Sequence, residues 1–473
     1  MISNQQTLPR PKKITPELQQ KYVEALIERY NKRTKTSKQM TQTYHPVHAD
    51  PRVSQWFEPL TKEMCYLIVG KEALGSRIWD IDGNEYIDIL LGFGANLVGH
   101  NPPFIKEALQ EQLEKGIQLG PQYEFAGEVA ELICELTGME RVAISNTGTE
   151  AVMTAIRLAR AATNRPKIAV FSGSYHGHFD GALVKKNLIN SQAVPRTTGV
   201  LPSMVKDVLV LDYGNPQSLK KIKANRGKLA AVLVEPVQTG RPDLQPKAFL
   251  QQLRQLTAES GIALIFDEMV TGFRLHLGGA QAWFGVEADI ATYGKVVGGG
   301  MPIGIIAGKA AYLDKIDGGM WNYGDASSPG VKKTFFAGTH CKHPLSMAAA
   351  RAMLQYLKEQ GPTLQENLNQ RTSQYVERLN VFFETNKIPI RMANFGSFFG
   401  PVFTGGAGSS KNLKIGMSLL RYHLFEKGIF LRGEGGGFLS TAHTDEDIDC
   451  IIQVMTDSMT ELQEAGFFPK SAT

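Results

Sequence analysis

The stretch Thr292-Tyr293-Gly294-Lys295-Val296-Val297-Gly298-Gly299-Gly300-Met301-Pro302 sets the expectations for the whole chain. The apolar run 288–292 predicts a buried strand, and Lys295 follows at its end. A lysine there is costly unless it stays neutral or bonds covalently, and a neutral lysine is the residue that forms a Schiff base with an aldehyde. The glycines allow the backbone to approach a flat ligand closely. The same letters also suit a surface turn with a solvated lysine, so other parts of the chain must decide.

The composition predicts a globular protein of two or three domains. The chain has 473 residues, of which 42% are hydrophobic and 21% are charged. Its formal net charge of +5 is too small for this length to indicate nucleic-acid binding, although it would tolerate an acidic protein partner.

The cysteines and the N-terminus predict a cytoplasmic location. The four cysteines are far apart and form no metal-binding pattern, which fits a reducing compartment: Cys65, Cys134, Cys341 and Cys450. The N-terminus is polar and contains proline, unlike a signal peptide. No apolar run is long enough to cross a bilayer, so no membrane partner is expected.

The N-terminal region, 1–40, predicts a polar lead followed by an amphipathic helix. Thr15-Pro16-Glu17 has the residue types of a helix start. One apolar face follows at helical spacing, made by Leu18, Tyr22, Val23, Leu26, Ile27 and Tyr30. The basic residues near its end indicate either a solvated helix end or a surface that docks on a neighbouring domain or carrier.

A second N-terminal region, 41–99, contains a predicted hairpin in which 77–81 and 85–89 alternate around Asp82-Gly83-Asn84. In the region 100–342, short apolar segments alternate with stretches that are mostly long enough for helices. The expected strands are 142–145, 168–171, 208–211, 230–234, 262–266 and 289–292. This alternation predicts an α/β fold with a mostly parallel sheet, covered by helices on both faces.

The C-terminal region, 343–473, predicts a smaller α+β domain. A long helix over 344–359 leads into shorter strands at 390–392, 398–403 and 429–431. Neither internal repeats nor low-complexity segments are evident.

Ser145-Asn146-Thr147-Gly148-Thr149-Glu150 follows a predicted strand and opens a predicted helix. The free amides at a helix start, with a glycine for close approach, suit a phosphate, and Gly148 and Thr149 would donate them. An ordinary capped strand-to-helix turn would have the same letters.

Phe171-Ser172-Gly173-Ser174-Tyr175-His176-Gly177-His178 follows another predicted strand. Tyr175 could stack on an aromatic ring. Neither histidine has the companion ligands of a metal site, so we expect packing or supporting roles for His176 and His178, and no metal.

Asp267 ends the strand before the one that leads to Lys295. A carboxylate at a buried strand end needs a cationic partner, although a helix cap or a structural ion pair would satisfy it too. Ligands of parallel sheets bind beyond the carboxyl ends of the strands. An aspartate and a lysine there, with a phosphate turn upstream, fit pyridoxal 5'-phosphate, which has a ring nitrogen, an aldehyde and a phosphate. Asp267 would keep the ring nitrogen protonated, and Lys295 would hold the aldehyde and move the proton.

These motifs resemble the class III aminotransferases of the fold type I pyridoxal-phosphate enzymes, over roughly 77–449. The matching segments are 146–151, 175–178, Asp267-Glu268 with Thr271-Gly272-Phe273-Arg274, Gly294-Lys295, Gly338-Thr339 and Pro344-Leu345. The resemblance implies a cofactor site made by Gly148, Thr149, Tyr175, Asp267, Lys295 and Thr339. It also implies a homodimer, since Thr339 would reach the phosphate of the other subunit. Glu235, in the Glu-Pro motif 235–238, is expected as a gate or supporting residue.

The branch within the class is less clear from the motifs. Val270 stands where many ω-aminotransferases have glutamine, and Thr-Gly-Phe-Arg is similar to glutamate-1-semialdehyde aminomutase. The segments 76–80, 318–325 and 431–438 instead resemble the aminotransferase domains of hybrid polyketide–peptide synthetases. That resemblance implies amination of a 3-oxoacyl chain held on an acyl carrier protein, with the N-terminal helix as a linker or docking piece.

The leading expectation is therefore an aminotransferase that takes the amino group from a donor amino acid, glutamate or glutamine, and gives it to a ketone. A thioester masks the carboxyl group of such an acceptor, so no fixed arginine is needed for it. Arg274 and Arg432 are candidates for the donor carboxylate. The alternatives are an aminomutase acting within one substrate and a non-catalytic cofactor-binding module.

Overall fold

The computed structural model describes residues 16–468, except 56, 188, 190, 191, 405–410, 432 and 434. Within them a seven-stranded sheet forms the centre of the large domain, with strand order β4-β12-β11-β10-β9-β5-β8. Its strands are β4 (Arg141–Ser145), β5 (Lys167–Phe171), β8 (Val208–Leu211), β9 (Leu229–Val234), β10 (Ala263–Asp267), β11 (Ile290–Gly294) and β12 (Gly304–Gly308). All neighbours pair in parallel except β12, which is antiparallel to both β11 and β4. The predicted α/β class with a mostly parallel sheet is confirmed.

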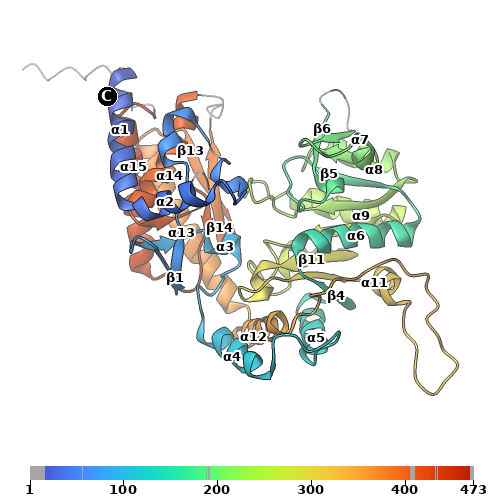
Figure 1. Ribbon diagram of the computed structural model, residues 1–473. Helices are drawn as coiled ribbons and strands as arrows, with labels where there is room; N and C mark the ends of the chain where they lie inside the picture. Colours follow the sequence, from blue (N-terminus) through green and yellow to red (C-terminus); the bar gives the residue numbers. More distant parts are fainter. Residues whose placement is uncertain are drawn as a thin grey trace, which may run out of the picture.

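The sheet is buried on both faces because its strands are almost continuously apolar. Along β9, for example, Ala231 and Leu233 pack into the cluster that contains α6, while Val232 and Val234 pack into the cluster on the other face. The elements around the sheet are α4 (Pro103–Lys115), α5 (Phe125–Thr137), α6 (Gly148–Thr163), α7 (Pro202–Val205), α8 (Pro216–Ala224), α9 (Lys247–Ser260), α10 (Gly279–Phe284), α11 (Ala310–Asp317) and α12 (Pro344–Gln360), with η3 (Asp180–Ala182), η4 (Lys295–Gly298) and a hairpin of β6 (Val184–Lys186) and β7 (Ala193–Pro195). Figure 1 shows α12 beside α4 and α5, on the large-domain side of the molecule.

The two ends of the described chain fold together. The N-terminal segment contains α1 (Pro16–Arg33), α2 (Lys35–Tyr44), η1 (Pro51–Val53), η2 (Pro59–Met64), β1 (Gly70–Leu74), β2 (Arg77–Asp80), β3 (Glu85–Asp88) and α3 (Leu91–Gly94). The C-terminal segment contains α13 (Thr363–Thr385), β13 (Ile390–Phe395), β14 (Phe398–Phe403), α14 (Lys411–Glu426), β15 (Ile429–Phe430), β16 (Gly437–Phe438) and α15 (Asp445–Glu464). Strand β15 extends the β1-β2-β3 sheet by pairing in parallel with β3. Figure 1 accordingly shows the blue and the orange-red elements side by side.

Helix α1 buries its apolar face against its own chain. Val23, Leu26 and Tyr30 are buried, and α1 packs on α14 and η2. The Tyr22 hydroxyl lies 2.8 Å from Nε2 of His423, which belongs to α14. The predicted amphipathic helix is thus present, and its apolar face forms part of the C-terminal domain. In the described part of the chain, no helix combines the length and the apolar character needed to cross a bilayer.

Candidate active site

Strand pairing brings Asp267 and Lys295 to the same edge of the sheet. Strands β10 and β11 run in parallel, with Asp267 opposite Thr292. Lys295 comes directly after β11 and begins η4 with φ 46°, a left-handed conformation that is strained for a residue other than glycine. The side chain is half-buried. The register therefore places the predicted carboxylate and the predicted lysine at adjacent strand ends, as the sequence led us to expect.

The Asp267 carboxylate is buried and has a buried histidine partner. Its Oδ2 lies 2.7 Å from Nδ1 of His176, and both side chains are 4% exposed. Its Oδ1 accepts from the Met269 amide at 3.2 Å and from the Thr292 hydroxyl at 3.4 Å. Nε2 of His176 is buried without a hydrogen-bond partner in the structure. His176 thus holds the Asp267 carboxylate in place, a direct contact that sequence reasoning left as a general supporting role.

The turn before α6 is a capped helix start, and its role as a phosphate site stays a prediction. Thr147 caps the helix by accepting from the Glu150 amide at 3.2 Å, and the Glu150 carboxylate accepts from the Asn146 amide at 2.8 Å. A Cβ at Gly148 would lie 2.8 Å from Sδ of Met269. A larger residue there would therefore displace Met269, which follows Asp267 by two positions in the sequence. The amides of Gly148 and Thr149, which precede the capped amide of Glu150, stay the predicted donors to an anion.

The Tyr175 loop packs directly on this turn. A Cβ at Gly177, where φ is 80°, would come within 2.5 Å of the Thr149 hydroxyl, and the His178 amide lies 3.4 Å from that hydroxyl. The Tyr175 ring is 64% exposed beside this contact. The structure therefore brings Gly148, Thr149 and Tyr175 to one end of the sheet.

Glu235 follows β9 and links the neighbouring loops. Its Oε1 accepts from the Thr239 amide at 3.0 Å and the Thr239 hydroxyl at 2.7 Å, and its Oε2 accepts from the Tyr175 amide at 3.2 Å. Burial raises the pKa of this carboxyl group, while the nearby His176 acts in the opposite direction. Glu235 is positioned to hold the Tyr175 loop, which agrees with the supporting role that the resemblance implied.

Arg274 does not reach the site. Its side chain is fully buried, and its guanidinium donates to the Ser397 hydroxyl at 2.8 Å, the Leu439 carbonyl at 3.1 Å and the Gly94 carbonyl at 2.7 Å. Burial lowers its pKa to about 9. We therefore withdraw Arg274 as a ligand of the donor carboxylate, because both terminal nitrogens donate to protein oxygens and the fully buried side chain leaves no surface for a substrate. Arg432, the other candidate, lies outside the described residues.

The Gly94 carbonyl that Arg274 binds ends an unusual left-handed turn. The φ angles of Leu91, Gly92, Phe93 and Gly94 are 48°, 60°, 59° and 89°, and two of these residues carry side chains that disfavour this region. Asp88 holds the start of the turn, since its Oδ1 accepts from the Leu91 amide at 3.0 Å. The turn α3 packs beside η4, which begins with Lys295. This strained turn was not predicted.

Thr339 is exposed and lies in the long connection between α11 and α12. Figure 1 shows this connection extending away from the body of the molecule before it returns to α12. At its returning end, Sγ of Cys341 lies 3.9 Å from the side-chain nitrogen Nδ2 of Asn146. Whether Thr339 reaches the phosphate site of a second subunit stays a prediction.

The residues brought together here fit pyridoxal phosphate. The buried Asp267 carboxylate is held by neutral or titratable donors and can accept from a protonated ring nitrogen. Nε2 of His176, which is buried without a hydrogen-bond partner, lies at these strand ends. The close contact between Gly177 and Thr149, which leaves no room for a larger residue than glycine, lies there too. Among the described residues, no group of three or more His, Cys, Asp or Glu side chains could hold a metal ion.

Comparison with known proteins agrees with this geometry. The class III aminotransferase profile matches residues 60–445. Glutamate-1-semialdehyde 2,1-aminomutase of Alkaliphilus oremlandii is 37% identical over 83% of this chain and 91% of its own length. A transaminase solved with PLP bound superposes with a TM-score of 0.79 and 28% identity, over 91% of this chain and 98% of that one. A β-phenylalanine aminotransferase from Variovorax paradoxus superposes with a TM-score of 0.81 and 26% identity, over 96% of this chain and 99% of that one. The chain belongs to the class III aminotransferase family and is a pyridoxal-phosphate-dependent enzyme of the α/β fold described above.

Proposed function

We propose that this enzyme transfers an amino group from an amino acid donor, glutamate or glutamine, to a ketone, and that the ketone is the β-carbon of a 3-oxoacyl thioester on an acyl carrier protein. The donor loses its amine and becomes a 2-oxo acid, while the ketone oxygen is replaced by the amine, so no outside oxidant or reductant is needed. The observation that supports the amine chemistry is the pairing of β10 with β11. Asp267 lies opposite Thr292, and Lys295 follows shortly after Thr292 along the chain.

Each residue at the carboxyl ends of these strands has a separate role in the proposed reaction. The bound cofactor supplies an aldehyde that carries the amino group and a ring that accepts electrons from the substrate carbon. Lys295 Nζ would hold the cofactor and move the proton to and from the reacting carbon. Asp267 would keep the ring nitrogen protonated, and His176 would keep the Asp267 carboxylate oriented. The α6 amides and the Tyr175 loop would hold the phosphate and the ring.

The choice of a 3-oxoacyl acceptor rests on two kinds of support. The segments 76–80, 318–325 and 431–438 resemble enzymes of hybrid polyketide–peptide assembly. The similar β-phenylalanine aminotransferase is named for a β-amino acid, which carries its amine at the position that we propose here.

We also propose that the enzyme works as a homodimer. The connection between α11 and α12 carries Thr339 and several large apolar side chains that are exposed in the single chain, among them Met320, Tyr323 and Phe335. Covering these side chains with a second copy would bury apolar surface, and it would allow Thr339 to meet the other subunit's phosphate.

The experiment combines purified enzyme with glutamate or glutamine and with a 3-oxoacyl thioester on a carrier protein, and identifies the products by mass spectrometry. The expected product is the 3-amino acyl thioester, formed together with one 2-oxo acid per turnover. Lys295→Ala serves as the control and should give no product. Failure of the wild-type enzyme to aminate any 3-oxoacyl thioester, with its cofactor bound, would refute the acceptor assignment.

A second candidate is a glutamate-1-semialdehyde 2,1-aminomutase, and the sequence relatives favour it. Besides the A. oremlandii enzyme, proteins of this name from other bacteria are 33–38% identical to the chain. An aminomutase moves the amine within one substrate and needs no separate donor. Turnover of glutamate-1-semialdehyde alone, without added amino acid, would establish this candidate and exclude the first.

A further inference from the structure

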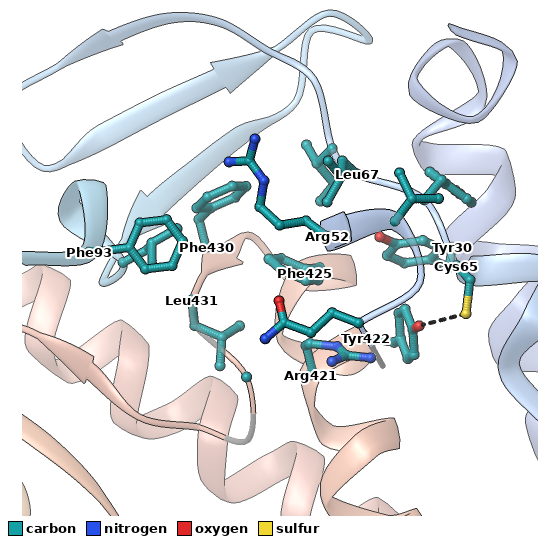
Figure 2. Close-up of a pocket in the computed structure, with 16 residues that line it drawn as sticks. Tyr30, Arg52, Cys65, Leu67, Phe93, Arg421, Tyr422, Phe425, Phe430 and Leu431 are labelled. Atoms are coloured by element: carbon teal, nitrogen blue, oxygen red, sulfur yellow. Dashed lines mark hydrogen bonds between the residues drawn. The ribbon is translucent and has the colours of Figure 1, made fainter. Parts of the chain in front are cut away.

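A largely apolar cleft lies between the N-terminal segment and the C-terminal domain. Its cavity volume is about 210 Å³. The N-terminal wall comes from η1 and the stretch 65–68, and the opposite wall comes from α14 and β15. The apolar and aromatic lining includes Tyr66, Leu67, Ile68, Phe93, Phe425 and Phe430. Figure 2 shows Phe93 and Leu431 at one end of the cleft and Tyr30 and Cys65 at the other.

Three of the polar side chains that line this cleft have partners within the chain. Arg52 pairs with Asp50, with Nη2 to Oδ2 at 2.8 Å and Nε to Oδ1 at 3.0 Å. Arg421 is buried, and its guanidinium lies 4.7 Å from the centre of the Tyr422 ring. The Tyr66 hydroxyl lies 2.7 Å from the hydroxyl of Thr34. A ligand here meets mainly hydrocarbon and aromatic surface, so an uncharged chain suits the cleft better than an anionic headgroup.

The Phe93 end of the cleft belongs to a turn that packs beside the element that begins with Lys295. The turn is the left-handed α3, and the element beside it is η4. Arg274 and Asp88 hold this turn in a conformation that Phe93 disfavours. Strain of this kind persists only where the surrounding structure enforces it, and it concentrates at functional sites. The turn therefore stands between the cofactor lysine and the apolar cleft.

We propose that this cleft is the binding site for the hydrocarbon tail of the amine acceptor, an acyl chain of medium length. The inference rests on the proposed function, because a 3-oxoacyl thioester has its ketone near one end and an alkyl tail beyond it. With the ketone at Lys295, the tail passes Phe93 and lies between Ile68 and Phe430. Each methylene that leaves water for such a site improves the transition-state affinity by up to about fourfold.

The test uses N-acetylcysteamine thioesters of 3-oxobutanoate and 3-oxooctanoate as acceptors. The second is longer by four methylenes, so kcat/KM for it should be higher on the order of 100-fold. Ile68→Trp fills the cleft and should lower this ratio at least about tenfold. Leu201→Trp places the same ring on the exposed surface of the large domain, outside the cleft, and should leave the ratio unchanged.

A binding measurement separates this inference from the proposed function. The octanoyl N-acetylcysteamine thioester has no ketone, so it cannot accept an amine, and calorimetry should detect its binding to the wild-type holoenzyme but not to Ile68→Trp. Amination of both acceptors at equal kcat/KM, without thioester binding, would overturn the tail site and leave the proposed function standing. If the thioester binds and no ketone is aminated, the proposed function fails and the cleft remains an acyl site. Absence of thioester binding together with a changed oligomeric state of Ile68→Trp would mark the cleft as a subunit contact and overturn the inference.

Discussion

Oδ2 of Asp267 lies 2.7 Å from Nδ1 of His176, and the two side chains are equally buried at the end of the central sheet. A carboxylate buried in this way is stable only with partners. The histidine also limits the directions in which the carboxylate can turn. This contact connects the loop after β5 with the end of β10. The position of the Asp267 carboxylate at the cofactor ring therefore depends on His176, which does not itself need to touch the substrate.

Replacing His176 should therefore weaken cofactor binding. His176→Ala leaves the Asp267 carboxylate without one of its hydrogen bonds, a loss of about 1.5–3 kcal/mol, or roughly 10- to 100-fold in Kd for pyridoxal phosphate. His178→Ala removes an exposed histidine two positions away and should have little effect. Titration of the apoenzyme followed by absorbance measures both. Equal Kd values for the wild type and His176→Ala would show that the contact does not orient Asp267.

Replacing Arg274 should reduce stability and leave donor binding intact. A lysine ammonium cannot reach the acceptors on Ser397, Leu439 and Gly94 together, so Arg274→Lys should lose about 2–3 kcal/mol of unfolding free energy. The KM for glutamate should stay within about twofold. Urea unfolding and steady-state kinetics test this pair of outcomes. A large rise in KM with unchanged stability would restore Arg274 as the carboxylate ligand.

His443 should make the fold sensitive to acid. Its Nδ1 accepts from the Ser440 amide at 3.1 Å, and burial lowers its pKa to about 4, from an ordinary value of 6.5. At this histidine the unfolded chain binds more protons than the folded protein between pH 6.5 and pH 4. The contribution of His443 to stability therefore falls as the pH decreases through this window, by about 3 kcal/mol.

Urea unfolding at several pH values between 4 and 7.5 measures this effect. His443→Asn should reduce the slope across that window but not abolish it, because burial also lowers the pKa of His423 to about 4, whereas the exposed His48→Asn should keep the wild-type slope. If His443→Asn and the wild type lose stability in parallel, the source of the acid sensitivity lies elsewhere.

Helix α1 should be required for folding. Leu26 is fully buried against the C-terminal domain, so Leu26→Ala should cost about 2–5 kcal/mol. Val381→Ala, on the exposed surface of α13, should change the unfolding free energy by less than about 0.5 kcal/mol. Thermal and urea unfolding compare the two. A wild-type Tm for Leu26→Ala would mean that α1 is an appended docking piece and not part of the domain.

Local sequence patterns were sufficient for six of the seven strands of the large sheet and for the positions of Asp267 and Lys295. The segments predicted as strands correspond to β4, β5, β8, β9, β10 and β11, and their ends differ from prediction by at most two residues. Buried parallel strands are continuous apolar runs, which makes them easy to recognise. Strand β12 was missed because it follows Gly299, Gly300 and Pro302 almost directly, and such residues usually indicate a loop.

The remaining features depend on contacts between segments that are distant in the sequence. Nothing near Arg274 indicates that its acceptors lie on Gly94, Ser397 and Leu439. The left-handed turn at Phe93 is stable only because these segments enclose it. The contact between His176 and Asp267 likewise depends on how the loops pack on one another. A buried arginine and an arginine ligand look the same in sequence, which explains why Arg274 was a candidate for the donor carboxylate beside Arg432.

The identity of the lysine that carries the cofactor tests the account most directly. Borohydride reduction of the holoenzyme fixes the bond between lysine and cofactor, and peptide mass spectrometry then locates it. The account predicts a single modified peptide, the one that contains Lys295, and loss of both the modification and the near-visible absorbance in Lys295→Ala. A modified lysine elsewhere, or a Lys295→Ala enzyme that keeps its absorbance and transfers amines, would contradict it.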